Sequence, residues 1–315
     1  MTVPIASIAS IACIIATRDR PDALATMLAT LAAQTRVPET VVLVDASSGT
    51  ESQQLFERGA DRFADPRYQR ASLAGAAAQR NEGVASVRAF ATTILFLDDD
   101  VRLAPDCVER LWAALDGDPG LGGVNAMITN QRYTSPGLVS RTLFRVLHGR
   151  RETTYAGLCV GPAMNLLPED RADLPDVVPV QWLNTTCTLY RTAALPAPPF
   201  PDRFTGYSLF EDVALSLTVG RTWRLANTRT ARIVHESRGG AHKSDPRAMA
   251  RMELVNRHFV MTRILGRRSL ADYARLLLVE AFGLANELRS ATGVTRLPHV
   301  VAGKCQGVID LLTGS

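Results

Sequence analysis

Three consecutive carboxylates, Asp98-Asp99-Asp100, directly follow an apolar segment at 94–97. Carboxylate oxygens are ligands that Mg²⁺ prefers, and this cation usually takes only one or two of them together with substrate phosphates. Adjacent carboxylates also repel one another unless a cation relieves the repulsion. The run therefore predicts an open site for a divalent cation that also binds a phosphorylated ligand. A helix N-cap or a solvated acidic turn is the alternative interpretation.

The segments around these aspartates alternate between strand and helix patterns. Continuous apolar runs, typical of strands buried on both faces of a parallel sheet, occur at 8–16, 40–44 and 94–97. A further short strand is expected at 67–71, and helices are expected at 22–34, 51–59, 74–88 and 105–115. This alternation predicts a parallel α/β sheet.

The carboxyl ends of the expected strands carry polar side chains. The first strand ends at Thr17 and Arg18, the second at Asp45, and the third at the aspartate run. Ligands of such sheets bind beyond the carboxyl ends of the strands. We therefore expect these three polar clusters to meet at one site.

The second half of the chain has less regular patterns. Residues 129–180 show little periodicity and are expected to form loops that cover the site or receive a second substrate. The remaining expected elements are a strand at 181–190, a loop at 196–207, a helix at 213–220, a short strand at 232–234 and helices from about 246 onward. Two further polar features lie at the ends of these elements: Glu211-Asp212 before the helix at 213–220, and His235 after the short strand.

The composition is that of a globular protein, with 315 residues, 46% apolar and 21% charged. The net charge of +4 is spread along the chain without a basic stripe, so no nucleic-acid partner is expected. The five cysteines form no CxxC pair, which favours a reducing cytoplasm over a disulfide framework or a zinc site. The apolar N-terminus lacks a basic segment and is interpreted as mature sequence. No apolar stretch has the length of a membrane-spanning helix.

Six short motifs follow one another along residues 8–240: IIATRDRP, VVLVDAS, QRNEG, ILFLDDDV, LFEDVALSL and IVHES. Each motif is weak alone, but their order and type resemble the inverting glycosyltransferases of family two, which have the GT-A fold. The resemblance implies an α/β fold with a mixed, mostly parallel sheet flanked by helices and a helical C-terminal extension. It implies a catalytic domain at 1–245, with a nucleotide-binding half at 1–128 and an acceptor half at 129–245, followed by the extension at 246–315.

The resemblance also implies an activity and a cofactor. A sugar would pass from a UDP-, dTDP- or GDP-linked donor to a carbohydrate or lipid-linked hydroxyl acceptor, in polysaccharide, glycolipid or glycoconjugate synthesis. The implied cofactor is Mn²⁺ or Mg²⁺. By similarity, Asp100 binds the metal directly, and Asp98 binds the ribose or a metal-bound water. Asp99 is placed near the nucleotide without a settled role.

His235 matches a histidine that completes metal coordination in some members of the family. Imidazole is a softer ligand than Mg²⁺ prefers, so this residue favours Mn²⁺. A histidine that binds no metal is the alternative interpretation.

The implied nucleotide pocket lies at the ends of the first two strands. Asp45 matches the carboxylate that accepts a hydrogen bond from the base, typically from N3–H of uracil. An Asx turn with Ser47 is the alternative for this residue. The other implied nucleotide-binding residues are Thr17, Arg18, Arg20, Arg80 and Asn81. A position on a helix surface is the alternative for Arg80.

Inverting transfer needs a group that takes the proton of the acceptor hydroxyl. By the family pattern Asp212 is this base, and Glu211 lies beside it. Trp182, Asn184 and Thr185 lie where family members line the donor-sugar and acceptor pocket, and Glu211 is assigned to the same pocket. The alternatives are a helix-dipole role for the acidic pair and an ordinary core position for the tryptophan.

The C-terminal tail combines arginines with apolar stripes at 247–264 and 270–289. A basic amphipathic helix can lie on an anionic membrane, as a peripheral protein does at the inner face. Helices packed on the catalytic domain, or against a second copy in a homodimer, are the preferred interpretation. The Gln-x-x-Arg-Trp run of processive synthases has only a weak match at 221–224, which favours single additions.

Two other classes of protein remain as alternatives. LDDDV loosely resembles the Asp-x-Asp motif of haloacid-dehalogenase-like phosphotransferases, but Lys243 and Lys304, the only lysines, are badly placed for that chemistry. The other class is a non-catalytic nucleotide-sugar-binding relative. The intact Asp100 and Asp212 argue against it.

Overall fold

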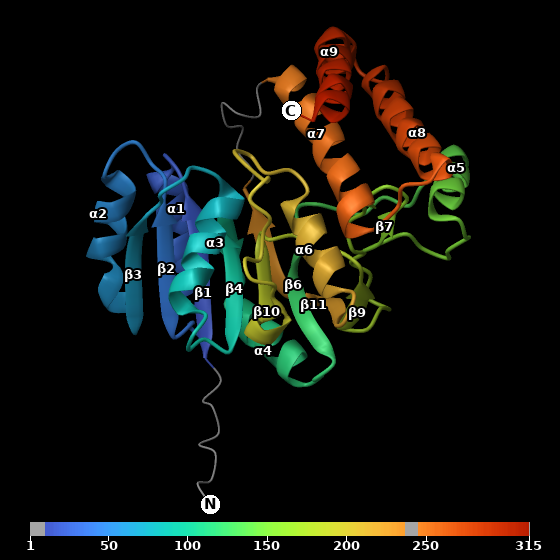
Figure 1. The fold of residues 1–315 in the computed structure, drawn as a ribbon. Helices are drawn as coiled ribbons and strands as arrows, with labels where there is room; N and C mark the ends of the chain where they lie inside the picture. Colours follow the sequence, from blue (N-terminus) through green and yellow to red (C-terminus); the bar gives the residue numbers. More distant parts are fainter. Residues whose placement is uncertain (1–9, 237–244, 315) are drawn as a thin grey trace, which may run out of the picture. The chain divides into compact units, whose positions relative to one another are not determined.

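The computed structural model describes residues 10–236 and 245–314. The chain divides into two compact units, whose elements Figure 1 labels. The sheet unit comprises Met1–Tyr133 and Pro168–Ser237, and the helical unit comprises Thr134–Leu167 and Arg238–Ser315. Residues 134–167 thus group with the C-terminal helices although they lie in the middle of the sequence. The division into functional halves at 128 and 245 stays a prediction.

The sheet unit contains a nine-stranded sheet with the strand order β3-β2-β1-β4-β10-β6-β11-β5, in which β9 also pairs with β11. Six strands run in one direction: β1 (Ile11–Thr17), β2 (Thr40–Asp45), β3 (Asp65–Arg70), β4 (Thr93–Asp98), β6 (Leu121–Ile128) and β11 (Arg224–His235). Three strands run against them: β5 (Val101–Leu103), β9 (Val177–Val180) and β10 (Cys187–Arg191). The expected mixed, mostly parallel sheet is confirmed.

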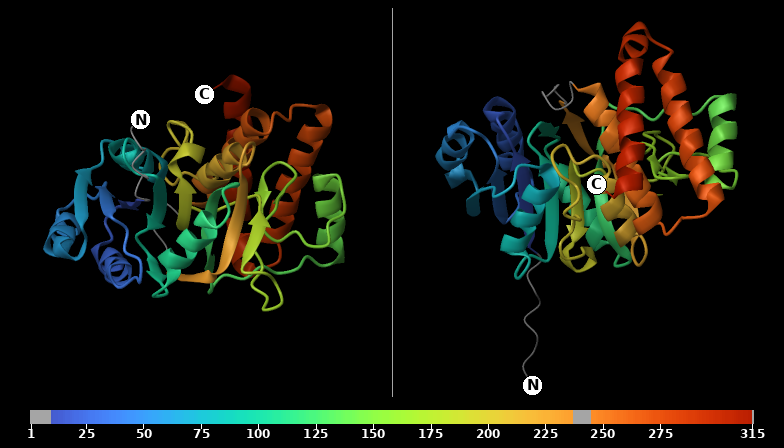
Figure 2. Two further views of the ribbon diagram at one scale, coloured as in Figure 1. Left: turned by 90° about the horizontal axis from the view of Figure 1, so that it is seen from below. Right: turned by 45° about the horizontal axis from the view of Figure 1, so that its top comes forward.

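Helices cover both faces of the sheet (Figure 2), because alternate side chains of its buried strands point to opposite faces. One face packs against α1 (Pro21–Ala32), α2 (Glu51–Arg58) and α4 (Cys107–Asp116). The other face is covered by α3 (Ala76–Val87) and α6 (Glu211–Val219). Gly83 lets α3 approach β1 closely, since a β-carbon at this position would overlap the side chain of Ile14. The short helical turns η1 (Ala60–Arg62) and η2 (Thr192–Ala194) complete this unit.

The strands and helices expected before residue 117 are present with small shifts at their ends, while residues 8 and 9 lie outside the described part of the chain. Before residue 129, two strands were not expected, β5 and β6. The pair Gly122-Gly123 interrupts the apolar pattern of β6. Both glycines are needed there, because Trp223 and Tyr190 occupy the space that their β-carbons would take.

Three expectations for the second half are wrong. The stretch 129–180 is not only loops, since it contains a helix of the helical unit and three short strands. The strand expected at 181–190 begins only at Cys187, because the polar residues before it form a buried loop. The strand expected at 232–234 is the end of the much longer β11, whose alternating polar residues hide its apolar pattern.

The helical unit contains α5 (Leu138–His148), α7 (Pro246–Phe259), the π-helical turn η4 (Val260–Ile264), α8 (Leu270–Glu287) and α9 (Ala291–Thr313), with the small hairpin of β7 (Cys159–Val160) and β8 (Met164–Asn165). Asp245, Ser269 and Ser290 cap the N-termini of α7, α8 and α9 with their side chains. No helix in the described part of the chain has both the length and the apolar character needed to cross a bilayer. The expected helical extension is confirmed.

Candidate active site

The aspartate run forms the turn between β4 and β5. Asp98 is the last residue of β4, and its backbone N–H donates to the carbonyl of Thr186 (3.0 Å). β5 then runs antiparallel to the end of β11, with Val101 opposite His235. This reversal brings the aspartates and His235 together, although they are far apart in the sequence.

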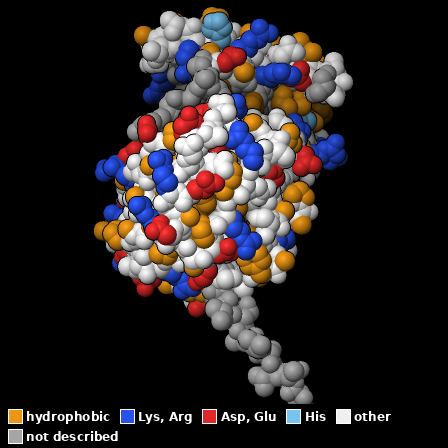
Figure 3. All heavy atoms as spheres, turned by 90° about the vertical axis from the view of Figure 1, so that its left-hand side faces the viewer, with side chains coloured by type: hydrophobic (Ala, Val, Ile, Leu, Met, Phe, Trp, Pro, Cys, Tyr) orange, Lys and Arg blue, Asp and Glu red, His pale blue; other side chains and the backbone are white. Residues whose placement is uncertain are grey.

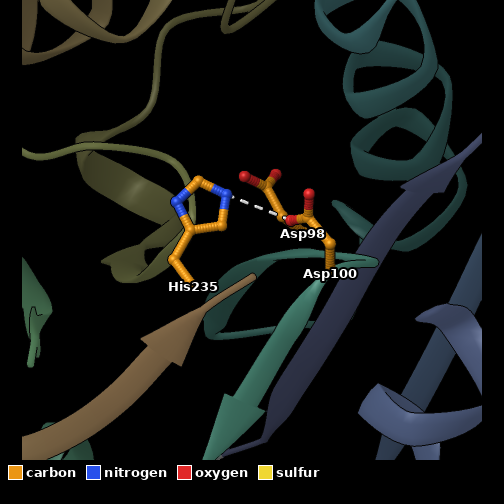
Figure 4. A group of neighbouring side chains, drawn as sticks. All are labelled: Asp98, Asp100 and His235. Carbon is orange, nitrogen blue, oxygen red and sulfur yellow. Dashed lines mark ion pairs between the residues drawn. The ribbon is translucent and has the colours of Figure 1, made fainter. Parts of the chain in front are cut away.

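Asp98, Asp100 and His235 form a compact cluster, which Figure 4 shows from one side. Each residue offers one ligand atom, and these atoms lie within 4.8 Å of one another. His235 Nε2 lies 3.1 Å from Asp100 Oδ1. Two carboxylate oxygens and one imidazole nitrogen suit a divalent cation such as Mn²⁺ and leave further coordination positions for phosphate oxygens. The residues present therefore fit the implied metal.

Two residues that sequence reasoning missed hold His235. Asn130 Nδ2 donates to the carbonyl of His235 (2.9 Å), and Asn130 Oδ1 accepts from its backbone N–H (3.1 Å). The amide of Gln131 lies 3.3 Å from His235 Nδ1, so that Nε2 faces the carboxylates. Such partners commonly orient a ligating histidine. Their only sequence signal is their place directly after β6, which was itself missed.

Asp99 makes a different set of contacts. Thr17 Oγ1 donates to Asp99 Oδ2 (2.7 Å), and Arg20 Nη1 lies 3.4 Å from Asp99 Oδ1 and 3.0 Å from Asp100 Oδ2. Burial raises the pKa of Asp99 to about 6, although the bond from Thr17 and the charge of Arg20 oppose this rise. Thr17 and Arg20 thus tie the end of β1 to the aspartate turn.

Arg80 joins the aspartate turn to the head of α6. Its Nη2 donates to Asp98 Oδ1 (2.6 Å), and its Nη1 donates to Glu211 Oε1 (3.2 Å). The residue is only 4% exposed, so it does not lie on a helix surface. One buried cation therefore connects the metal cluster with the acidic pair.

The acidic pair forms the first turn of α6. Asp212 Oδ2 accepts a hydrogen bond from Trp182 Nε1 (3.1 Å), and its Oδ1 accepts from the N–H of Val213 (2.7 Å). Burial raises the pKa of both carboxyls above their ordinary values, and the neighbouring charge of Asp212 adds to the rise at Glu211. The indole bond and Arg80 act in the opposite direction at Asp212. A carboxyl with a raised pKa suits proton transfer near neutral pH.

Asp45 is fully buried at the end of β2. Its Oδ1 accepts the N–H of Ser47 (2.7 Å), which is the Asx turn considered above. Its Oδ2 accepts from the hydroxyl of Tyr68 (3.1 Å) and lies 3.8 Å from Arg70 Nη1. Tyr68 and Arg70 lie in the strand expected at 67–71, but no motif singled them out as site residues. A contact of Asp45 with a base stays a prediction.

Arg18, Gln79 and Asn81 also lie near the expected nucleotide pocket in the sequence, but their contacts differ. Arg18 is largely exposed beside Asp19, at 3.5 Å. Gln79, which was not singled out, donates from Nε2 to the carbonyls of Thr17 (2.9 Å) and Val44 (2.7 Å) and so joins the ends of β1 and β2. The Asn81 amide exchanges two hydrogen bonds with the backbone of Phe200 (2.7 and 3.0 Å). Nucleotide contacts by Arg18 and Asn81 stay predictions.

Three of the four predicted pocket residues lie in the loop between β9 and β10, and the fourth, Glu211, begins α6. Trp182 is the one whose side chain contacts the acidic pair. Asn184 and Thr185 are buried in the same loop, and the carbonyl of the next residue, Thr186, accepts the N–H of Asp98. The loop thus supports both halves of the site, and the contact of Asn184 and Thr185 with a sugar stays a prediction.

Comparison with known families agrees with this geometry. The model of the family described as "Glycosyl transferase family 2" matches residues 12–161, which is just under half of the chain. The match includes the aspartate run but ends before Asp212 and His235. It agrees with the resemblance seen in the motifs over residues 12–161. The aspartates therefore belong to this pattern and not to a phosphotransferase motif. No curated protein matches the chain significantly.

Several solved structures share the fold. The mannosyltransferase PcManGT from Pyrobaculum calidifontis, in complex with GDP-Man and Mn²⁺, has a TM-score of 0.54 and 15% identity, over 96% of this chain and 79% of that one. S. aureus TarS 1-349, in complex with UDP-GlcNAc, has a TM-score of 0.52 and 16% identity, over 97% of this chain and 92% of that one. A longer S. aureus TarS chain has a TM-score of 0.51 and 16% identity over 90% of this chain, which spans only 44% of that protein. These likenesses confirm the GT-A fold.

Proposed function

We propose that this glycosyltransferase moves a sugar from a nucleotide-diphosphate sugar to a hydroxyl acceptor, with a divalent cation and with inversion at the anomeric carbon. The observation that carries the proposal is the network Asp98–Arg80–Glu211. It joins a three-residue metal cluster to a buried acidic pair at one edge of the sheet. A leaving diphosphate needs a cation and an attacking hydroxyl needs a base, so the two groups must lie side by side.

The donor is assigned to the ends of β1, β2 and β4. Asp45, Thr17, Arg18, Arg20 and Asp99 lie there, and they offer carboxylate acceptors and guanidinium donors for a base, a ribose and phosphates. We infer a UDP-, dTDP- or GDP-linked donor. The fold neighbours with UDP-GlcNAc and with GDP-Man support this class of donor without choosing among its members.

Asp100, with Asp98 and His235, is assigned to the cation. A bound Mn²⁺ or Mg²⁺ neutralises negative charge on a diphosphate leaving group. The imidazole favours Mn²⁺, and the fold neighbour with Mn²⁺ is consistent with that choice. Arg80 holds the Asp98 carboxylate in place through a hydrogen bond from its Nη2.

Asp212 is assigned as the general base. The acceptor oxygen forms a bond to the anomeric carbon while the bond from that carbon to the phosphate oxygen breaks, and the nucleoside diphosphate leaves with the electron pair. The acceptor proton passes to the Asp212 carboxylate. Trp182 fixes this carboxylate through its indole N–H and favours the ionised form that accepts the proton.

The acceptor is a carbohydrate or a lipid-linked hydroxyl, in polysaccharide, glycolipid or glycoconjugate synthesis with single additions. We place the enzyme in a reducing, cytoplasmic compartment, which agrees with its five free cysteines. Asn184 and Thr185 are proposed to line the pocket for the transferred sugar or the acceptor.

A panel of nucleotide sugars tests the proposal. Wild-type protein and Asp100→Ala are compared for thermal stabilisation by Mn²⁺ alone and by Mn²⁺ with each donor, and for donor hydrolysis. Because Asp100→Ala removes a metal-binding carboxylate, donor hydrolysis should fall roughly a thousandfold, and Mn²⁺ should no longer raise the thermal stability. Asp116→Ala, at an exposed position on α4, is the matched control. The proposal fails if no nucleotide or nucleotide sugar stabilises the protein and Asp100→Ala behaves as wild type.

A further inference from the structure

The outer face of α8 is apolar along its whole length. Leu270 is 90% exposed, Leu277 is 68% exposed and Leu288, just after the helix, is 59% exposed. With a period of 3.6 residues these positions belong to one stripe. The α8 stripe consists of Leu270, Ala274, Leu277, Leu278, Ala281, Ala285 and Leu288, all exposed. A helix at a water-facing surface normally shows the opposite polarity.

The inner face of α8 carries a charge beside the buried Leu276 and Val279. Glu280 is only 8% exposed and pairs with Arg257 of α7 and with Lys304 of α9. Glu253 of α7 also accepts from Arg257 (2.7 Å) and Lys304 (2.6 Å). Two cations and two anions thus pair between the three helices. Buried charges of this kind need such pairing, because an unpaired one is strongly unfavourable.

The last helix, α9, also exposes apolar side chains. Small or charged residues face α7: a β-carbon on Gly303 would overlap the backbone of Arg247, and Asp310 pairs with Arg251. Its exposed large apolar side chains are Val294, Val301, Val308, Ile309 and Leu312. Figures 1 and 2 show α8 and α9 as neighbouring helices.

The charged side chains that are exposed in this unit are almost all cationic. Within its described residues the only exposed acid is Asp245. The exposed arginines are Arg141, Arg145, Arg150, Arg151, Arg247, Arg251, Arg263, Arg268, Arg289 and Arg296. Over its whole sequence the unit has 16 Lys and Arg against seven Asp and Glu, a net charge of +9. An apolar helix face on a unit that also exposes many arginines complements a layer of anionic headgroups above acyl chains.

We propose that the helical unit docks on an anionic lipid surface, with the α8 stripe in the interface and the arginines at the headgroups. The helix lies on the bilayer, because no described helix can cross it and the Glu280 network holds α8 against α7 and α9. A second copy of the chain is a poorer occupant. A twofold contact through this face would bring two units of charge +9 together, whereas anionic lipid compensates that charge.

Co-sedimentation of the full chain with vesicles tests this proposal independently of catalysis. We expect binding to equimolar phosphatidylcholine and phosphatidylglycerol, weaker binding in high salt, and little binding to phosphatidylcholine alone. Leu277→Asp should weaken binding about tenfold or more. Replacing Arg289 and Arg296 together by Gln should weaken it about tenfold.

Matched controls lie in the sheet unit. Leu73 is as exposed as Leu277, at 67%, and Arg62 is an exposed arginine. Leu73→Asp and Arg62→Gln should leave vesicle binding unchanged. The proposal is overturned if the wild type binds neither vesicle, or if Leu277→Asp binds as well as wild type. A stable dimer in solution that Leu277→Asp converts to a monomer, without vesicle binding by either form, would assign the face to a second copy instead.

Discussion

The two units of this chain distribute charge and apolar surface in opposite ways. The sheet unit has 19 Lys and Arg against 24 Asp and Glu, a net charge of −5, while the helical unit has +9. Among the described residues, the exposed large apolar side chains of the sheet unit are Leu73 and Phe90, whereas the helical unit has many. Figure 3 shows acidic and basic side chains interspersed on the face at the β3 edge of the sheet. The overall charge of +4 hides this contrast.

Buried charges differ between the units as well. At the candidate active site, burial raises the pKa of Asp99 and Asp212, because Arg20 and Arg80 compensate the carboxylates only in part. In the helical unit, burial also disfavours the charged form of Glu253, but Arg257 and Lys304 outweigh it and hold the pKa of Glu253 below its usual range. Incomplete compensation is a feature of sites that bind a cation or move a proton, and full compensation is a feature of a structural network.

The largest effect is expected at the proposed base. Asp212→Asn should lower transfer about a thousandfold, because the amide cannot accept the acceptor proton. Donor binding, measured by thermal stabilisation with nucleotide and Mn²⁺, should remain. Asp202→Asn, in the loop before α6, serves as control. Loss of donor binding in Asp212→Asn would contradict the assignment as base.

A loss of stability is expected from the buried network of the helical unit. Glu280→Gln should lower the free energy of unfolding by about 3 kcal/mol, because Arg257 and Lys304 then share one anion. Chemical denaturation of the full chain measures this change. Glu287→Gln, at a more exposed position of the same helix, should cost little. Equal stability of the two variants would show that the ion pairs of Glu280 do not stabilise the helical unit.

A smaller effect is expected at Trp182. The rate of transfer should fall at acidic pH, because Asp212 must be ionised to act as base and burial holds its pKa above the usual range. Trp182→Phe removes a hydrogen bond that lowers this pKa, so the acidic limb of the pH–rate profile should move upward by about one unit. Trp112→Phe, on α4, is the matched control. An unchanged or downward-shifted limb would mean that the indole does not set the titration of the base.

No effect on chemistry is expected from the α8 stripe. Leu277→Asp should leave hydrolysis of a soluble donor and the midpoint of thermal unfolding at wild-type values, since the side chain is 68% exposed. Donor hydrolysis and differential scanning calorimetry check this. A loss of hydrolysis would show that the two units are not separable in function.

The sequence alone determined much of the sheet unit. Strands β1, β2 and β4 have continuous apolar runs, because they are buried on both faces of the sheet, and each run ends in the polar residues that form the site. The acidic pair at the head of α6 was visible for a similar reason, since an apolar helical segment follows it. These patterns are local, and local patterns can be read without a structure.

Only the tertiary structure decided how these residues are paired. The sequence did not show that Arg80 bridges Asp98 and Glu211, or that Asn130 and Gln131 hold His235, because these contacts join segments distant in the chain. It also did not show which side of α8 faces solvent. The same helix carries Glu280 and Leu277, and packing against α7 and α9 turned the charge inward and the leucine outward. Which side chains face solvent depends on how the helices pack, and the sequence of one helix does not contain that information.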